Sequence, residues 1–502
     1  MVTFQPTCAQ PTGPSFVQDP HIRSSWDIIR GSLAVIILCT WSILHLHVPP
    51  QLRAPPRSES RWRRRSRQLL RGLYEFQRKA KWAIMTMMLP ELVLGCALES
   101  YLGAKESSRK INEFLREEAG DDEEGAVEWT LAHSMYANIG GFVLKFPART
   151  NDETVAAARP NENSEQWPVA RWLDEYAEHN RRHHRFRGGA FDWDVHPRHY
   201  ALAEEYLHSV SLDLKSNEQR ALRTLIGNVW AITPLQLLEA RRLGIIDRIP
   251  AITEAEIQDK SKEDALVKAV AMLKVLMLGI GLAQRAAEGR ASSQLEIMAL
   301  AFACCALFSY LVLLPQPQDV ATPTYITASR SPSSKAELQT IAKLGYVILG
   351  CSHDYTIPDF TAALRPGSGF VTSVGTGAAL VLFGSIHLFA WDFSFPSSLE
   401  KWLWQVSAVL VTGLPLCWLL LLLGLRLAGL ELQSSSSSTS GKKKRIFRQD
   451  WGSKVFLATT VVVAVVYKIP RVYLIVEAFR STYYLPPESY ISTWTSSVSR
   501  LP

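Results

Sequence analysis

Several common kinds of enzyme chemistry have no recognisable motif in this sequence of 502 residues. It contains no phosphate-binding loop, no dinucleotide fingerprint, no serine nucleophile elbow and no HExxH zinc motif. The seven cysteines are odd in number and form no CxxC pair, and five of them lie in segments that are predicted spans or weaker span candidates. Neither a disulfide framework nor a cysteine metal site is therefore predicted. No cofactor is predicted, and the lack of an Asn-x-Ser/Thr acceptor indicates long loops that do not face a glycosylating compartment.

Hydrophobic residues are abundant and strongly segregated along the chain. Five runs are nearly free of charge, whereas 105–128 and 147–263 are as polar as a soluble protein; the apolar runs are Gly31–Val48, Leu295–Leu314, Phe370–Trp391, Trp402–Leu430 and Val455–Val466. A helix needs about 20 apolar residues to cross the hydrocarbon core with its backbone groups satisfied. The pattern predicts an all-α polytopic membrane protein with about six spans, in a range from about five to eight. Its middle section is predicted to be cytosolic, helical and partly disordered. Within it, Thr233 followed by Pro234 predicts the start of a helix that Gly244 ends, and Thr253 with Glu256 predicts a capping box that starts a second helical stretch.

These alternations divide the chain into membrane and aqueous segments. We expect a loosely ordered N-terminus (1–30), a first span that is retained and not cleaved (31–48), a basic cytosolic loop (49–81), two weak spans or interfacial helices (82–146), a cytosolic polar section (147–263), a two-span hairpin (264–315), a loop (316–369), a second two-span hairpin (370–430), a Ser-rich and basic loop (431–454), and a last span with a C-terminal tail (455–502).

Basic residues form two clusters beside apolar runs. Residues 49–81 carry eleven Lys and Arg, and a second cluster spans Lys442–Arg448. The positive-inside rule places both clusters in the cytosol, which leaves the N-terminus lumenal or extracellular, in an endomembrane or the plasma membrane. The expected partners are the lipid bilayer and its anionic head groups, at Arg61–Lys81 and at Lys442–Arg448. Nucleic acid is not expected, because each patch adjoins a predicted span.

Three ionisable residues in apolar surroundings are candidates for catalysis, because a charge inside the bilayer persists mainly where it faces protein or a wet cavity. Glu91 follows Pro90, and its carboxylate could accept a proton or pair with Lys268 or Lys274 on a neighbouring span. Glu99 lies two helical turns further on, on a similar face. His387 lies near a predicted membrane boundary and could titrate near neutral pH. The alternative is that 82–104 is an interfacial helix whose carboxylates lie in water.

A cluster of histidines in the polar middle section suggests a metal site. The candidate ligands are His179, His183, Asp192, Asp194, His196 and His199. Imidazole and carboxylate are ligand types that zinc and iron accept. Five arginines lie among them and would repel a divalent cation, so the alternative is a solvated basic segment near anionic lipid.

Several segments together resemble a large family of fungal membrane proteins that mostly have no assigned activity. The resemblance rests on WDIIRGSL and LCTWSILHLHVP in 26–49, PE at 90–91, MYANIGGFV at 135–143, ITPLQLLE at 232–239, EIQDKSKEDALVK at 256–268, IHLFAWDFSFPSSLEKWLW at 386–404 and RVYLIVEAFR at 471–480. It implies a multi-span fold over nearly the whole chain and an association with secondary-metabolite pathways, and it carries no residue roles.

The sequence leaves three functions open. The first is an accessory or scaffold membrane protein whose cytosolic section contacts a partner. The second is a membrane-embedded enzyme that acts on a lipophilic small molecule, for example in an acid-catalysed cyclisation, with Glu91, Glu99 or His387 as proton donor. The third and weaker one is a transporter, which the lack of a visible internal repeat disfavours.

Overall fold

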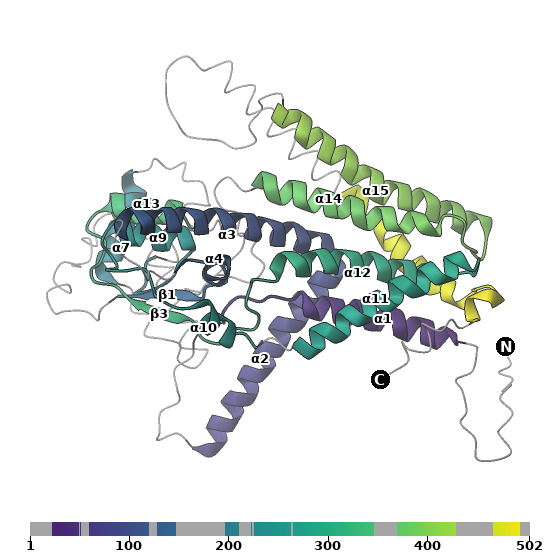
Figure 1. The fold of residues 1–502 in the computed structure, drawn as a ribbon, viewed down its shortest axis with the longest axis horizontal. Coiled ribbons are helices and arrows are strands. Elements are labelled where there is room, and N and C mark those ends of the chain that lie inside the picture. Colours follow the sequence, from purple (N-terminus) through teal and green to yellow (C-terminus); the bar gives the residue numbers. More distant parts are fainter. Residues whose placement is uncertain are drawn as a thin grey trace, which may run out of the picture.

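The computed structural model describes residues 23–49, 51, 60–119, 128–146, 196–209, 222, 225–262, 265–345, 369–427 and 465–491. Helices dominate these residues, and two parts are visible in Figure 1. Long helices form a bundle on the right, and short helices with a small sheet form a compact domain on the left. We call these parts the helix bundle and the sheet domain.

The helix bundle contains the long apolar helices. They are α1 (Ser25–Ser42), the first half of α3 (Pro90–Ala119), α11 (Ala265–Ala287), α12 (Gln294–Leu313), α14 (Gly369–His387), α15 (Ser398–Leu427) and the helical residues 465–480. Among the described residues, four helices are long and apolar enough to cross a membrane, namely α11, α12, α14 with the short helix η2 (Leu388–Ala390), and α15. The count becomes five if α2 (Arg61–Met88) and α3, which meet at a bend of 103°, form one broken span.

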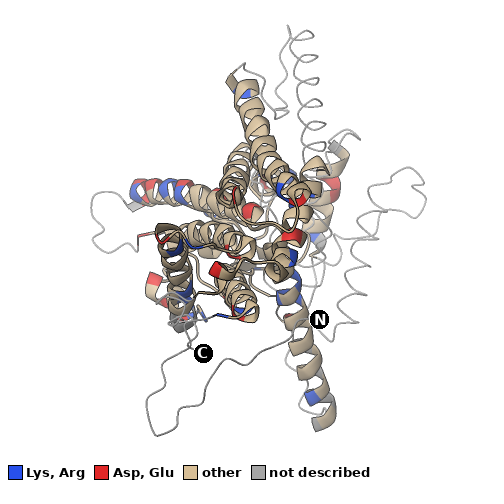
Figure 2. Cartoon of the chain, turned by 90° about the vertical axis from the view of Figure 1, so that its right-hand side faces the viewer, with Lys and Arg blue, Asp and Glu red and all other residues tan. Residues whose placement is uncertain are grey.

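The outer surface of the bundle is apolar. Leu273 and Leu276 on α11, Leu420 on α15, and Ile469 and Val472 in the last helix are each more than half exposed. Figure 2, which views the bundle from the right-hand side of Figure 1, shows most of its described residues in tan, the colour of all residues other than Lys, Arg, Asp and Glu. A soluble protein rarely leaves so large an apolar surface uncovered, and lipid tails would cover it without cost.

Glycines bring the bundle helices into close contact. A Cβ at Gly95 of α3 would overlap Thr376 of α14 and lie 2.8 Å from its backbone nitrogen. One at Gly384 of α14 would lie 2.8 Å from the carbonyl oxygen of Val411 on α15. Small residues at helix crossings allow backbones to approach in membrane bundles, where close packing drives association.

The ends of the bundle far from the sheet domain are tied together by buried polar groups. Arg23, just before α1, forms an ion pair of 2.5 Å with Glu296 in the first turn of α12. Arg285, near the end of α11, donates hydrogen bonds to the backbone oxygens of Ile491 and Ser489 at 2.8 and 3.1 Å. These residues lie beside the short helices η3 (Ser481–Tyr483) and η4 (Pro487–Tyr490). The start of α1, the end of α11 and the start of α12 therefore lie together at this end.

The sheet domain is built around three short strands, so the all-α prediction needs correction. β1 (Phe142–Lys145) lies in the centre, antiparallel to β2 (Val229–Ala231) and parallel to β3 (Thr324–Thr327). Around the sheet lie α4 (Leu131–Asn138), α7 (Pro197–Ser209), α9 (Pro234–Arg242), α10 (Glu254–Asp259) and α13 (Lys335–Lys343). Its core contains residues that are far apart in sequence, including Phe142, Tyr206, Trp230 and Leu338.

The helix boundaries of the domain follow local signals in the sequence. The side chain of Thr233 accepts a hydrogen bond from the backbone of Gln236, and Pro234 occupies the first turn of α9. Gly244, two residues after α9, has a φ of 67°, which favours glycine as a stop signal. Thr253 and Glu256 form the capping box that begins α10. These predicted boundaries are confirmed.

Helix α3 joins the two parts without a break. Its first half packs against α12 and α14, and its second half packs against α4 and α9. Ser107 and Ser108 of α3 donate hydrogen bonds to the hydroxyl oxygen of Ser134 on α4, at 3.2 and 2.8 Å, and Asn112 donates one to the carbonyl of Trp129. The sheet domain is thus fastened directly to a helix of the bundle.

Two segments predicted to contain membrane spans, 31–48 and 82–146, are not single straight helices in the structure. The run 31–48 is helical only to Ser42, after which residues 43–48 extend toward the domain, where the Val48 N–H donates to the carbonyl of Ile139 at 2.9 Å. Within 82–146 neither candidate is one straight span. Residues 82–104 contain the bend at Leu89, since Pro90 starts a new helix, and 129–146 contain the short α4 followed by β1.

Candidate functional site

The bend between α2 and α3 places Glu91 deep inside the helix bundle. α2 ends at Met88 and α3 begins at Pro90, whose missing N–H and fixed φ suit the first position of a helix. Glu91 therefore lies in the first turn of α3, near the positive end of the helix dipole, and is 1% exposed.

Glu91 forms a buried ion pair with Arg471 from the last helix of the bundle. One guanidinium nitrogen of Arg471 binds Glu91 Oε1 and also donates to the Tyr467 hydroxyl at 2.9 Å, and the other donates to the carbonyl oxygen of Met88 at 3.1 Å. Glu91 Oε2 has no hydrogen-bond partner among the described residues. The prediction that Glu91 pairs with Lys268 or Lys274 is wrong. A carboxylate held by a guanidinium is a poor proton donor, because losing its charge would leave the arginine uncompensated.

His387 lies beside this ion pair and is separated from it by Phe383. The guanidinium of Arg471 lies 4.3 Å from the Phe383 ring centroid. His387 is 1% exposed, and its Nδ1 lies 2.8 Å from the Phe383 carbonyl oxygen, to which it donates when that nitrogen carries the proton. Trp404 on α15 closes the other side, with its indole N–H donating to the His387 carbonyl at 3.3 Å. His387 thus belongs to the packed interior where α14 meets α15.

Glu99 is buried on α3 but lies apart from the Glu91 pair. It is 5% exposed. Eight residues of helix separate the two carboxyl groups by about 12 Å along the axis. The structure therefore brings Glu91 close to Arg471, and the Phe383 side chain separates this pair from His387. Glu91 and Glu99 do not form a carboxylate pair.

Two of the predicted metal ligands, His196 and His199, lie in the core of the sheet domain. Their rings stack with centroids 3.9 Å apart and an interplanar angle of 22°. Stacked imidazoles direct their nitrogen lone pairs roughly parallel, so the two rings do not converge on one ion. Among the residues the structure describes, no group of three His, Cys, Asp or Glu could hold a metal. His179, His183, Asp192 and Asp194 lie outside the described residues.

His199 is enclosed by aromatic rings and is held in its neutral form. Phe146 and Trp230 lie 4.5 and 4.8 Å from its ring, and its Nδ1 lies 3.3 Å from the carbonyl oxygen of Gly227. Burial lowers the pKa of His199 well below 6.5, and His196 and Arg198 lower it further, whereas the hydrogen bond to Gly227 raises it.

This pKa shift predicts acid sensitivity of the sheet domain. Below pH 6.5 the unfolded chain binds a proton at His199 that the folded chain excludes, so stability falls as the pH falls toward the folded-state pKa. The slope from one proton is at most about 1.4 kcal/mol per pH unit. We expect His199→Phe to flatten the fall of the thermal unfolding midpoint below pH 6.5. The matched control is His208→Gln on the same helix. If His208→Gln flattened the pH dependence of the unfolding midpoint equally, the acid sensitivity could not be assigned to His199.

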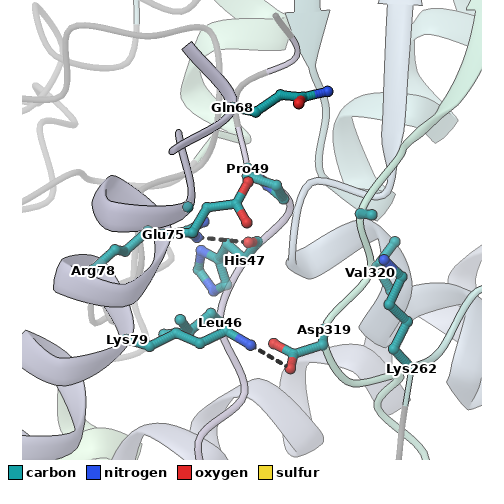
Figure 3. Close-up of a pocket in the computed structure, with 12 residues that line it drawn as sticks. Leu46, His47, Pro49, Gln68, Glu75, Arg78, Lys79, Lys262, Asp319 and Val320 are labelled. Carbon is teal, nitrogen blue, oxygen red and sulfur yellow. Dashed lines mark hydrogen bonds and ion pairs between the residues drawn. The ribbon is translucent and has the colours of Figure 1, made fainter. Parts of the chain in front are cut away.

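A pocket of about 380 Å³ lies where α2 meets the base of the bundle (Figure 3). We call it the junction pocket. Its lining comes from four parts of the chain and comprises Leu46, His47, Pro49, Gln68, Gly72, Glu75, Arg78, Lys79, Lys262, Asp319, Val320 and Ala321. Glu91, Glu99 and His387 are not part of this lining.

Two polar contacts hold the walls of the junction pocket together, and Figure 3 shows both. Arg78 donates to the His47 carbonyl oxygen at 2.7 Å, and Lys79 forms an ion pair of 2.7 Å with Asp319. Asp319 has a φ of 54°, in the left-handed region that Asp tolerates better than most residues. The Lys79 ammonium also lies 5.7 Å from the Trp41 ring centroid, which links α2 to α1.

The sequence alone does not reveal either arrangement in full. It marks Arg471 only as the polar end of a span beside Lys468 and Pro470, and the one available signal is that an apolar segment contains a cation that needs a partner. Lys262 and Asp319 stand in loops, and no motif of known function marks either residue. They become neighbours through the fold.

Comparison with known proteins identifies a family. A family model described as a family of unknown function, DUF8562, matches residues 2–165, 161–338 and 371–497. The chain belongs to this family. No curated protein and no solved structure gives a match. In this DUF8562 chain Glu91, His387, Arg471 and the residues of the junction pocket all lie within matched segments, and the match itself assigns no activity.

Proposed function

We propose that this DUF8562 protein is a multi-pass membrane protein that holds its sheet domain against one face of the bilayer, in an accessory or scaffold role. The observation that carries the proposal is helix α3. Its 30 residues run without interruption from the interior of the helix bundle into the core of the sheet domain. A continuous helix fixes the position and orientation of the domain, whereas a flexible linker would only limit its distance.

We further propose six membrane spans with the sheet domain in the cytosol. The spans are α1, α11, α12, α14, α15 and the helix that contains residues 465–480. The bent pair α2–α3 enters the bundle and returns to the side of the domain. The positive-inside rule then places the N-terminus in the lumen or outside the cell, in an endomembrane or the plasma membrane. Anionic head groups would contact Arg61–Lys81 on α2, and also Lys442–Arg448, which lie outside the described residues.

A role in fungal secondary metabolism remains part of the proposal through the resemblance alone. Two alternatives, an enzyme that acts on a lipophilic intermediate and a transporter, require a proton-active side chain, such as Glu91, Glu99 or His387, that faces a cavity. The contacts of Glu91 favour the structural role, because Arg471 holds one of its oxygens and the junction pocket lies elsewhere.

A rescue experiment distinguishes the scaffold from the enzyme. The gene is deleted in the organism of origin, and the change in the metabolite profile is recorded. The chain is then returned with the ion pair replaced by apolar residues of similar size, Glu91→Leu with Arg471→Met. A scaffold that needs only the packed bundle is expected to restore the profile, since well-packed apolar residues can replace a buried pair. An enzyme that uses the Glu91 proton would not be restored.

The control is the amount of folded protein in the membrane. Wild type and the double variant are compared at matched abundance, measured by size-exclusion chromatography of the solubilised chain. Failure of the double variant at matched abundance would overturn the scaffold assignment and support acid chemistry at Glu91.

A further inference from the structure

The lining of the junction pocket carries a net positive charge. Its lining holds three cationic side chains, Arg78, Lys79 and Lys262, against two carboxylates, Glu75 and Asp319. Lys79 and Asp319 neutralise each other, and Glu75 offsets one of the two remaining cations, so the lining keeps one net positive charge. Lys262 is exposed and forms no side-chain ion pair with any residue that the structure describes. A volume of about 380 Å³ falls in the usual range for small-ligand sites.

Helix α2, which forms one wall of the pocket, has a second face that is apolar and exposed. Gln68, Gly72, Glu75 and Lys79 follow the helical repeat and line the pocket. About a quarter turn around the helix lies a stripe of large apolar side chains that are 63–84% exposed; it comprises Trp62, Leu69, Leu73 and Phe76. This pattern is that of a helix lying in the plane of a membrane interface.

The position of α2 indicates what covers the apolar stripe. α2 projects sideways from the base of the helix bundle (Figure 1), and its last turn continues into the bundle beside exposed Ile84 and Met88. The stripe is therefore continuous with the apolar surface that faces lipid. A bilayer around the bundle would reach α2 at the depth of its head groups, which places the junction pocket at the same level.

We propose that the junction pocket binds the phosphate of an anionic phospholipid headgroup. Lys262 supplies the cation that no described side chain neutralises, Arg78 adds guanidinium N–H donors from the opposite wall, and the acyl chains run along the apolar stripe of α2. An ammonium forms a point-charge contact with phosphate, and a guanidinium adds directed N–H donors. The inference rests on the proposed function, because it needs α2 to lie at the membrane interface.

Gly72 provides a direct test, since it lines the pocket and a Cβ there meets nothing within 4 Å. Gly72→Phe fills the pocket, and Gly72→Ala leaves it open, while both replace a poor helix former. The purified full chain is incubated with an equimolar mixture of phosphatidylglycerol and phosphatidylcholine, and the retained lipid is measured by native mass spectrometry. Wild type and Gly72→Ala are expected to retain phosphatidylglycerol selectively, and Gly72→Phe is expected to lose this selectivity.

A charge variant tests the same site without changing its shape. We expect Lys262→Gln to raise the apparent Kd for phosphatidylglycerol about fivefold, which corresponds to about 1 kcal/mol for one cation at an anionic surface. The matched control is Lys343→Gln, which removes the same charge from an exposed position at the end of α13. It is expected to leave the Kd unchanged.

The outcomes separate the ligand sources and the two proposals. Equal phosphatidylglycerol retention by wild type, Gly72→Phe and Lys262→Gln would overturn the pocket assignment. Displacement of the lipid by inorganic phosphate or glycerol 3-phosphate at comparable affinity would assign the site to a soluble phosphate and overturn the lipid source. Neither result bears on the sidedness of the sheet domain, which is measured independently by labelling of introduced cysteines.

Discussion

Replacement of Arg471 by Met is expected to destabilise the helix bundle by about 3–5 kcal/mol, because it leaves the carboxylate of Glu91 buried without its counter-charge. Glu91 is 1% exposed and Arg471 is 6% exposed, so water cannot replace the missing partner. The change also removes the hydrogen bonds to the Tyr467 hydroxyl and to the Met88 carbonyl at the α2–α3 bend. Thermal unfolding of the purified variant and wild type in the same detergent measures the effect.

The double variant Glu91→Leu with Arg471→Met is the matched partner of this experiment. Removal of both charges leaves no uncompensated group, so most of the lost stability should return. Arg109→Met is a useful control, because Arg109 and its partners Glu106 and Glu113 are all about half exposed, and such pairs are expected to matter little. If the double variant were as unstable as Arg471→Met alone, the ion pair would not explain the loss.

Replacement of Gly95 by Leu is expected to separate α3 from α14. Even the first atom of a side chain at this position would meet the backbone nitrogen of Thr376 at 2.8 Å, and backbone cannot move aside as a side-chain tip can. Overpacking a tight interior typically costs about 1–3 kcal/mol, and a backbone clash places this change at the upper end or beyond. We expect a lower unfolding midpoint and a lower yield of monodisperse protein.

Gly279→Leu on α11 is the matched control, because a Cβ at Gly279 meets nothing within 4 Å. It should be neutral or slightly stabilising, since leucine is a better helix former than glycine. Equal losses in the two variants would show that Gly95 has no special place at a helix crossing.

Local signals in the sequence predicted local structure well. The capping residues Thr233 and Thr253 and the stop at Gly244 act within one or two helical turns, and each appears in the structure where the sequence places it. The long apolar helices α12, α14 and α15 are equally visible, because a run of about twenty apolar residues is typical of a membrane span.

Features that depend on distant parts of the chain could not be predicted. The strands have only three or four residues each, and β1 pairs with segments that follow it by more than 80 residues, so no alternating pattern is long enough to reveal a sheet. The partner of Glu91 could not be predicted either, because Arg471 is also far from Glu91 in the sequence. Several cations border apolar runs, and only the packing of the last helix against α3 and α14 selects Arg471.

The sidedness of the sheet domain and of the far end of the helix bundle tests the account most directly. The seven native cysteines are first replaced by alanine. Single cysteines are then introduced as Lys343→Cys in the domain and as Tyr483→Cys at the far end, where Tyr483 is 81% exposed, and sealed vesicles of known orientation are treated with a membrane-impermeant maleimide. We predict that Lys343→Cys is labelled only from the cytosolic side and Tyr483→Cys only from the opposite side. Labelling of both positions from one side of an intact membrane would contradict the six-span arrangement.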